Sequence, residues 1–309
     1  MQRPPVLNLG TVVLVTAAVI GLLLAACSPE EPAATPAATP SASPAPTPTP
    51  TLSAELLDRP WSVLYVGTDH NERREGEGQP LNTDALMLVS LSADQSELTL
   101  VSLPRDTVDI PLPDGTIHPR KINGLYAEQG IEALVGAMET LYDLEIDGHV
   151  VLDMDDFAAL VEAVDGVEVT LEEPLVDPIV DLDLEPGTQV LDASQTLGYV
   201  RTRVDQDYGR MGRQQEVIVE LVVRLVDPDT DLDLAALIDG LDSLETDLPL
   251  DELPTLLELG KRAADAEVSN LVIEPPLIVS EGDIGDGRGY ILIPDIEAIR
   301  AEVQELIGG

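Results

Sequence analysis

Short runs of β-branched and aliphatic residues open the folded part of the chain. Those at residues 61–67, 85–92 and 97–106 each predict a β-strand, because high strand propensity is combined with flanking turn residues. A short polar loop separates the second run from the third, so we expect these two to form an antiparallel hairpin. Later runs predict further strands, at residues 149–154, 166–171 and 290–293.

Helical periodicity appears between these runs. The first helix has its apolar stripe at Ile131, Leu134, Val135, Met138 and Leu141. In the next predicted helix, which follows the strand at residues 149–154, Asp155 or Asp156 serves as the N-terminal cap and Phe157 is buried. A strongly apolar helix is expected at residues 214–226, and others near residues 232–244, 250–264 and 295–307. Strands mixed with helices throughout predict an α/β fold, with helices packed on a mixed sheet.

The N-terminus has the features of an export signal. Arg3 gives it a weak positive charge, and residues 11–27 form an apolar run that ends in small residues. The final LAAC is similar to a bacterial lipobox, in which Cys27 is lipidated and becomes the mature N-terminus. The alternative is an uncleaved signal anchor, because residues 7–27 could cross a bilayer, which takes ~20 residues. Either form predicts a protein held at the extracytoplasmic face of the cell membrane.

A proline-rich segment follows the signal at residues 28–54. Eight of the 26 residues from 28 to 53 are proline, and large apolar side chains are almost absent. Such a segment buries too little surface to fold, so we expect a disordered, polyproline-like stalk. The sequence therefore predicts a signal at residues 1–27, a stalk at 28–54 and one folded domain at 55–309.

Composition narrows the possible functions. Acidic residues outnumber basic ones by 58 to 16, and the formal net charge of −42 argues against binding nucleic acid and against a DNA-binding regulator. Phe157 and Trp61 are the only residues of their types, so an apolar pocket must be walled mainly by aliphatic side chains. With Cys27 as the one cysteine there is no disulfide framework, and the histidines lack zinc-motif spacing.

Basic residues are concentrated in the stretch YVRTRVDQDYGRMGRQQ, residues 199–215, which holds four of the chain's arginines. A charge run is often a solvated face, but the spacing here favours a site. Arg201 and Arg203 would share one face of an extended segment. Gly209 would allow a turn. The start of the next helix would then carry three polar residues on one side, Arg210, Arg213 and Gln214.

Polar residues at the ends of the predicted strands supply the other half of a site. They are Asp69 after the first strand, Asp84 before the second, Arg105 and Asp106 at the end of the third, and Lys121 and Asn123 beyond it. Carboxylates beside arginines can be plain salt bridges. At a phosphate site, however, carboxylates hold Mg²⁺ and arginines neutralise the phosphoryl charge. The spacing therefore favours a phosphate or diphosphate site.

Six segments resemble, in order, those of the LytR-CpsA-Psr family: VGTD, NTDALMLVSL, LTLVSLPRDT, KINGLYAEQG, DFAALVEAVDGVEV and the arginine-rich stretch. The resemblance covers residues 61–225, and residues 226–309 form a helical extension without a sharp motif. It implies an α-β-α sandwich around a central mixed sheet. It also implies a Mg²⁺-dependent phosphotransferase that moves a glycopolymer from a polyprenyl-diphosphate carrier to peptidoglycan, with the prenyl tail in an apolar tunnel.

The resemblance also implies roles for individual residues. Asp84 and Asp207 would be ligands of Mg²⁺ or Mn²⁺, and Asp69 would organise the metal or take part in proton transfer. The side chains expected to act in catalysis are Asp69, Arg105, Arg201 and Arg210. Those expected to bind the diphosphate are Arg105, Lys121, Arg201, Arg203, Arg210, Arg213 and Gln214.

Two positions depart from the family pattern, because Asn82 stands where an arginine is usual and His70 where a basic residue is frequent. Either the missing charges weaken diphosphate binding, or Arg73 or Arg74 replaces them. The lipobox is a third departure, since relatives mostly carry an uncleaved membrane helix. Two other functions stay open, a lipoprotein that binds polyprenyl phosphate or wall polymer without turnover, and a polyprenyl pyrophosphatase.

Overall fold

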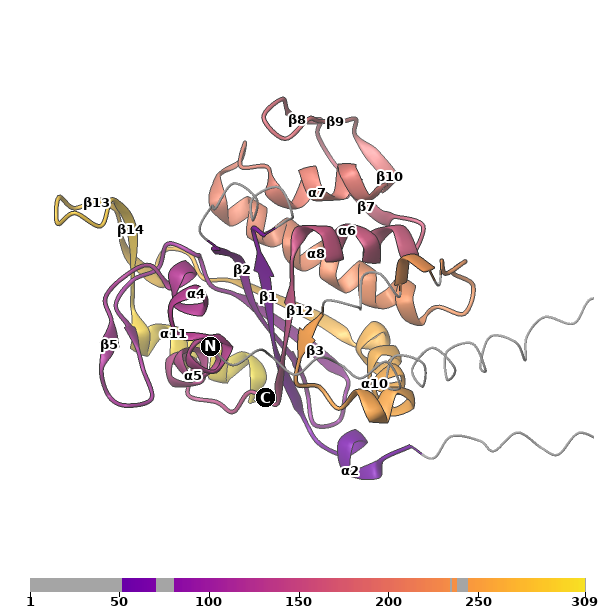
Figure 1. The fold of residues 1–309 in the computed structure, drawn as a ribbon, viewed down its shortest axis with the longest axis horizontal. Helices are drawn as coiled ribbons and strands as arrows, with labels where there is room; N and C mark the ends of the chain where they lie inside the picture. The colour runs from indigo at the N-terminus through magenta and orange to yellow at the C-terminus, as the bar shows by residue number, and fades with distance from the viewer. Residues whose placement is uncertain (1–51, 71–80, 234, 238–243, 309) are drawn as a thin grey trace, which may run out of the picture.

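The structure is a computed structural model that describes residues 52–70, 81–233, 235–237 and 244–308. The predicted export signal with Cys27 and nearly all of the predicted stalk lie outside these residues, as do Arg73 and Arg74. Within the described part of the chain, no helix has both the length and the apolar character needed to span a membrane. The described residues form an α/β fold around one large sheet (Figure 1).

Six of the described strands form the central sheet, in the order β11-β6-β1-β2-β3-β12. They are β1 (Trp61–Thr68), β2 (Thr83–Leu91), β3 (Glu97–Ser102), β6 (Gly148–Leu152), β11 (Glu245–Thr246) and β12 (Glu267–Val272). β2 runs antiparallel to β1 and β3, and β11 runs antiparallel to β6. β6 is parallel to β1, and β12 is parallel to β3. The predicted hairpin and the predicted mixed sheet are both confirmed.

The sheet has two apolar faces, because successive residues of a strand point to opposite sides. Leu64 of β1 lies opposite Leu88 of β2 on one face, and Tyr65 lies opposite Met87 on the other. A sheet that is apolar on both faces must be covered on both faces. This requirement accounts for the three layers of the fold.

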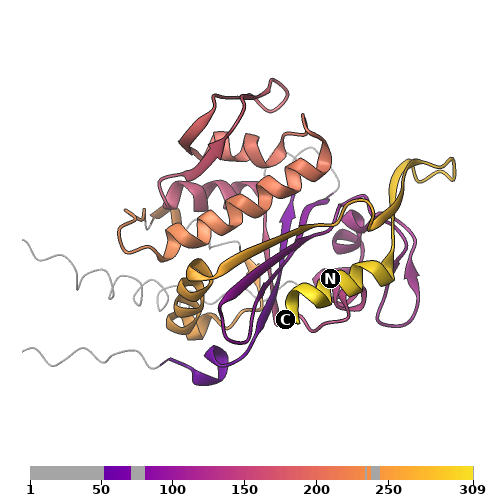
Figure 2. The ribbon, with the colours of Figure 1, turned by 180° about the vertical axis from the view of Figure 1, so that it is seen from behind.

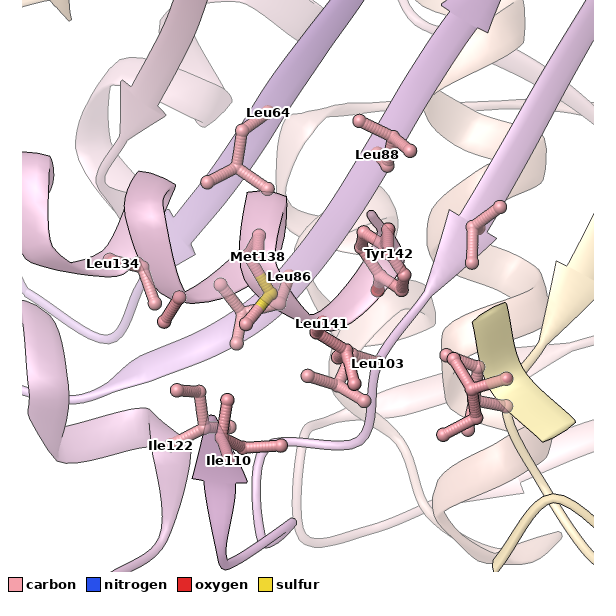
Figure 3. Packing of buried hydrophobic residues seen from close by; sticks show 14 of the residues in the cluster. Leu64, Leu86, Leu88, Leu103, Ile110, Ile122, Leu134, Met138, Leu141 and Tyr142 are labelled. Atoms are coloured by element: carbon pink, nitrogen blue, oxygen red, sulfur yellow. The ribbon is translucent and has the colours of Figure 1, made fainter. Parts of the chain in front are cut away.

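The first face is covered by α4 (Leu125–Gln129), α5 (Ile131–Tyr142) and α11 (Ile296–Ile307). Leu134, Met138 and Leu141 of α5 are completely buried among leucines of β1 and β2 (Figure 3). The apolar stripe predicted for this helix is therefore confirmed.

The second face is covered by α8 (Gln206–Val226) and α10 (Leu253–Asp265), with the short α2 (Ala54–Leu57) beside α10 (Figure 2). A further apolar cluster, which includes Val161, Tyr199 and Leu221, packs α8 against outer elements. These elements are α6 (Met154–Ala163), α7 (Ala193–Arg201), and the antiparallel pairs β7 (Val167–Leu171) with β10 (Gly187–Leu191) and β8 (Leu175–Asp177) with β9 (Leu182–Leu184).

The remaining described elements are short. They are β4 (Ile110–Pro111), β5 (Ile117–His118), the 3₁₀ turns η1 (Ile122–Gly124) and η2 (Leu250–Glu252), and the hairpin of β13 (Ile278–Asp283) and β14 (Tyr290–Pro294). The hairpin projects from the body of the molecule (Figure 1).

Several predicted elements differ from those observed. The cap of α6 is Asp153, whose side chain accepts hydrogen bonds from the N–H groups of Asp155 and Asp156, so neither of these is the cap. α8 begins at Gln206, eight residues before the predicted start. Of the helix predicted near residues 232–244, residues 235–237 are helical, and residues 234 and 238–243 lie outside the described part. Residues 226–309, predicted as a helical extension, also supply β12 to the central sheet.

Gly166 joins α6 to β7 in a conformation that other residues adopt poorly. Its φ is +91°, and an added Cβ would lie 2.6 Å from the carbonyl oxygen of Leu191. We expect Gly166→Ala to lower the free energy of unfolding by about 2–4 kcal/mol, through backbone strain and this clash. Gly187→Ala is the matched control, since Gly187 has a φ of +116° but no described atom within 4 Å of an added Cβ. Chemical denaturation should show the larger loss for Gly166→Ala, and equal losses would contradict the clash.

Candidate functional site

A pocket of about 310 Å³ opens where β1 ends and β2 begins, beside α7 and α8. It also receives residues from the loop after β3, from β6 and from α6. Seven of the residues predicted for the site line it, namely Asp69, Asp84, Arg105, Arg201, Arg203, Arg210 and Gln214. Segments that are far apart in the sequence thus bring their charged side chains to one place.

Part of the pocket wall is apolar. Leu152, Leu197 and Ile218 contribute to it, together with Phe157 and Tyr65. Most of the apolar lining is aliphatic, as the scarcity of aromatic residues predicts, although the chain's one phenylalanine takes part. The pocket therefore joins a cluster of arginines to an apolar wall, which suits a ligand with an anionic head and an apolar tail.

Asp69 directly follows β1 and is held by Asn82. The backbone N–H and the side-chain amide of Asn82 donate to the two carboxylate oxygens of Asp69, at 2.8 and 3.0 Å. The backbone N–H of Asp69 donates to the Asn82 carbonyl at 3.0 Å. A neutral amide thus occupies the position where the family pattern favours an arginine, and it orients the carboxylate without adding a positive charge.

Arg105 extends from the loop after β3 to Asp84 in β2. Its Nη1 donates to Asp84 Oδ1, and its Nε lies 3.7 Å from Asp106 Oδ2. The other Asp106 oxygen is 2.8 Å from Lys121 Nζ. Lys121 is therefore paired with Asp106 behind Arg105 and is not among the residues that line the pocket.

The segment around Arg201 and Arg203 is not extended, contrary to the prediction. Arg201 is the last residue of α7, and Arg203 lies in the turn before α8. Asp207, in the first turn of α8, has Oδ1 at 3.2 Å from Arg203 Nε and at 3.0 Å from Arg210 Nη2. The arginines still converge, because the end of α7 and the start of α8 meet at the same pocket.

Arg213 does not line the pocket but joins α7 to α8. Its guanidinium donates to the carbonyl oxygens of Tyr199 at 2.9 Å and Thr202 at 2.7 Å, and it pairs with Asp205 at 2.5 Å. The sequence suggested that Gly209 allows a turn. In the structure, Gly209 lies inside α8 instead. A Cβ at this position would collide with the Asp205 carboxylate. The glycine thus makes room for the group that pairs with Arg213.

Two adjacent glutamines on α8 position the helix. Gln214 lines the pocket and donates to a backbone carbonyl of α7 at 3.1 Å. Gln215, which the sequence analysis missed, is 1% exposed and donates to Ser102 Oγ at 2.9 Å and to the Leu271 carbonyl at 3.0 Å. These bonds fix α8 against β3 and β12. A polar residue on the inward side of an amphipathic helix was the signal that could have identified it.

Three buried polar atoms of the site have no hydrogen-bond partner among the described residues. They are Arg105 Nε, Arg210 Nε and Asp207 Oδ1. Asp207 Oδ1 is close to the guanidinium groups of Arg203 and Arg210, but these contacts are charge pairs that lack hydrogen-bond geometry. Buried polar atoms cost free energy when they stay unpaired. Burial also lowers the pKa of Arg210, and the Asp207 carboxylate opposes this. The arrangement fits a site that is completed by a polar ligand.

Two carboxylates fit a divalent metal: Asp84 lines the pocket, and Asp207, which is not among the lining residues, contacts Arg203 and Arg210, which are. Burial acts to lower the pKa of Arg105, but the carboxylates of Asp84 and its neighbours Asp106 and Asp207 outweigh it and raise the pKa. No group of three or more potential ligands in the described part of the chain could hold a metal ion by itself. Mg²⁺ is commonly bound by one or two carboxylates together with substrate phosphates. Asp84 and Asp207 fit that pattern if a diphosphate supplies the remaining oxygens.

Comparison with known proteins agrees with this architecture. Biofilm regulatory protein A of Streptococcus mutans is 27% identical over 263 residues, which cover 79% of this chain and 63% of the relative. The polyisoprenyl-teichoic acid–peptidoglycan teichoic acid transferase TagU of Enterococcus faecalis is 29% identical over 252 residues, which cover 80% of this chain and 78% of the relative. The chain spans between half and two thirds of the length of three curated relatives that it matches, the S. mutans protein among them.

A solved structure and a family model complete the comparison. The crystal structure of Bacillus subtilis TagV superimposes with a TM-score of 0.63 at 24% identity, over 81% of this chain and 98% of that one. This similarity confirms the predicted α/β fold of helices around a central mixed sheet. The model of the LytR_cpsA_psr family matches residues 33–300, well beyond the motifs at 61–225. The chain therefore belongs to the LytR-CpsA-Psr family.

Proposed function

We propose that this protein transfers a glycopolymer from a polyprenyl-diphosphate carrier to a hydroxyl of peptidoglycan, at the extracytoplasmic face of the membrane. The observation that carries the proposal is the convergence of four arginines on a pocket with an apolar wall, Arg105, Arg201, Arg203 and Arg210. A polyprenyl diphosphate has the matching chemistry, a doubly charged head and an aliphatic tail. The name of the E. faecalis relative, a teichoic acid transferase, supports the same reaction.

The arginines would hold the diphosphate, and the apolar wall would take the first part of the prenyl tail. A guanidinium can bind phosphate oxygens through two parallel hydrogen bonds, so it orients the phosphate as well as neutralising it. Arg210 is 2% exposed, so water screens its charge little. Arg201 is absent from the ion pairs found among the described residues, which leaves its guanidinium available to a ligand.

In the proposed reaction, the acceptor hydroxyl oxygen forms a bond to the phosphorus nearest the sugar. The bond from that phosphorus to the bridging oxygen breaks, and polyprenyl phosphate leaves with the electron pair. Preorganised guanidinium groups stabilise the charge that develops on the phosphates. The Asp69 carboxylate, oriented by Asn82, is the group proposed to accept the hydroxyl proton.

Asp84 and Asp207 are the proposed ligands of Mg²⁺ or Mn²⁺. When bound, the ion would neutralise diphosphate oxygens and align them for displacement. Both carboxylates are already in contact with site arginines, Asp84 with Arg105 and Asp207 with Arg210. The residues proposed to bind metal and those proposed to bind phosphate are thus held by one another.

The proposed tether is the N-terminal segment, as a lipoprotein anchored through Cys27 or as a signal anchor. The support is the apolar run at residues 11–27 and the proline-rich segment after it. A carrier with a polyprenyl tail stays in the membrane, so a tethered enzyme would meet its donor there.

Incubation of the purified protein with a polyprenyl-diphosphate-linked glycan, peptidoglycan fragments and Mg²⁺ tests the proposal. We expect glycan joined to peptidoglycan through a phosphodiester, with an equal amount of polyprenyl phosphate released. EDTA, or the substitution Asp84→Asn, should reduce the product by a factor of about 100 or more, because the arginines alone would have to neutralise and align the diphosphate. Glu132→Gln, which changes a carboxylate on the opposite layer of the fold, is the matched control.

Two results would contradict the proposal. Tight binding of the donor without any product would indicate a binding protein. Release of polyprenyl phosphate without glycan attached to peptidoglycan, at all acceptor concentrations, would indicate a pyrophosphatase.

A further inference from the structure

One aromatic side chain of this protein is exposed. Tyr290, the first residue of β14, has 52% of its surface accessible. The sequence contains one Phe, one Trp and six Tyr, all within the described part of the chain, and the others are buried or half-buried. In a chain so poor in aromatic residues, the exposure of Tyr290 calls for a position-specific explanation.

Backbone hydrogen bonds attach β14 to the loop that carries Arg105. The N–H of Leu292 donates to the Asp106 carbonyl at 3.1 Å, and the N–H of Val108 donates to the Leu292 carbonyl at 3.0 Å. Tyr290 is two residues before Leu292 on the same strand. It is therefore held close to the residues that directly follow Arg105.

The other strand of the hairpin is attached to α8. The hydroxyl of Tyr208 donates to Glu281 Oε2 of β13 at 2.9 Å. Tyr208 directly follows Asp207 in the first turn of α8. The β13–β14 hairpin is thus bonded to the loop that carries Arg105 and to the helix that carries Arg210. None of its residues, all of them described, lines the pocket, but it lies against two of the elements that supply site arginines, and we call it the rim.

This rim is acidic, whereas the pocket is rich in arginine. The register of the hairpin pairs Tyr290 with Asp283, and Glu281 lies two residues from Asp283 on the same face. Partial burial raises the pKa of Tyr290, and the carboxylates of Glu281, Asp106 and Asp207 add to this. A polyanionic chain would be repelled by such a surface. An uncharged sugar would not, and its hydroxyl groups can donate hydrogen bonds to carboxylates.

We propose that Tyr290 and Glu281 form the subsite for the acceptor, an uncharged sugar ring whose hydroxyl attacks the donor. This inference rests on the proposed transfer function and specifies where its second substrate binds. The apolar C–H face of the sugar packs on the tyrosine ring, which combines a large apolar surface with a polar edge. The sugar hydroxyls donate to Glu281 and Asp106. A ring bound there presents a neighbouring hydroxyl towards the arginine cluster.

Competition between water and sugar for the same donor tests the subsite. The probe is an uncharged tetramer of N-acetylglucosamine, added to donor and Mg²⁺, and the readout is the ratio of glycan transfer to donor hydrolysis. Tyr290→Ala should lower this ratio about tenfold, which corresponds to about 1.4 kcal/mol. Tyr290→Phe, which keeps the aromatic ring, should have a transfer-to-hydrolysis ratio close to that of the wild type. Val279→Ala, a 59% exposed residue of the same hairpin, should match the wild type.

Titration calorimetry of the tetramer without donor separates the subsite from the transfer function. The dissociation constant should rise about tenfold in Tyr290→Ala, whether or not the protein turns over a donor. Binding that depends on Tyr290 in a protein without turnover would support the subsite and contradict the transfer function. A wild-type ratio and a wild-type dissociation constant in Tyr290→Ala would overturn the subsite, even if donor transfer is observed.

Discussion

Arg210→Met is expected to lower the rate of glycan transfer by a factor of about 100 or more while the protein stays folded. The guanidinium is almost completely buried, and its Nε has no hydrogen-bond partner in the described part of the chain. Its charge would meet the diphosphate in a region of low dielectric constant, where a preorganised group contributes most. Removing it leaves Asp207 paired with Arg203 at 3.2 Å, so no carboxylate is left without a cation.

The free energy of unfolding of Arg210→Met should fall by about 1–2 kcal/mol, less than the roughly 3–5 kcal/mol typical when one partner of a buried ion pair is removed, because Arg203 still pairs with Asp207. Steady-state kinetics with the lipid-linked donor and urea denaturation measure the two quantities. Arg120→Met, which removes a largely exposed arginine that pairs with Glu128 and does not line the pocket, serves as the control for a lost positive charge. A loss of activity that merely follows a loss of folded protein would contradict the proposed role.

Arg213→Met should show the opposite behaviour, with a large loss of stability. The substitution removes the donors that satisfy the carbonyl oxygens of Tyr199 and Thr202. These hydrogen bonds join α8 to the end of α7, so the contact between the two helices is weakened. Unpaired buried carbonyl groups cost about 1–3 kcal/mol each. We expect the free energy of unfolding to fall by about 2–4 kcal/mol and the melting temperature by about 5–15 °C.

Differential scanning calorimetry and donor binding, measured below the melting temperature, distinguish this structural role from a direct contact with ligand. Arg213→Lys is the matched variant, because it keeps the charge but cannot reach both carbonyl oxygens with a planar fork. It should lie between the wild type and Arg213→Met in stability. An unchanged melting temperature with a large loss of donor affinity would place Arg213 among the ligand-binding residues instead.

Strong local periodicity predicted the strands and helices of the fold best. The stripe of α5 reflects burial on one side of a helix, and the continuous apolar runs of β1 and β2 reflect burial on both faces of the sheet; the sequence expresses both directly. β12 was missed because its residues are half-exposed at the edge of the sheet and pair in parallel with distant β3. That pairing is a tertiary contact with no local signal. α7 was missed because it carries few apolar residues over a short length.

The site was predicted in outline because its charged residues stand at the ends of strands and at a helix start. Spacing placed Arg210 and Arg213 on one side of a helix, but it could not show which of them faces the pocket. Arg213 turns to the carbonyl oxygens at the end of α7, and that partner exists only after α7 has formed. The sequence identified Asn82 only as a missing charge, and it could not show that the same side chain donates a hydrogen bond to Asp69.

The central claim is that separate guanidinium groups and two acid side chains enclose one doubly phosphorylated head. The most direct measurement is titration calorimetry of the purified protein with a short polyprenyl diphosphate and with the corresponding monophosphate, both in Mg²⁺. The diphosphate should bind at least about tenfold more tightly, a difference of about 1.4 kcal/mol, and Arg210→Met should remove most of that preference. Equal affinity for the two lipids in the wild-type protein would contradict the claim.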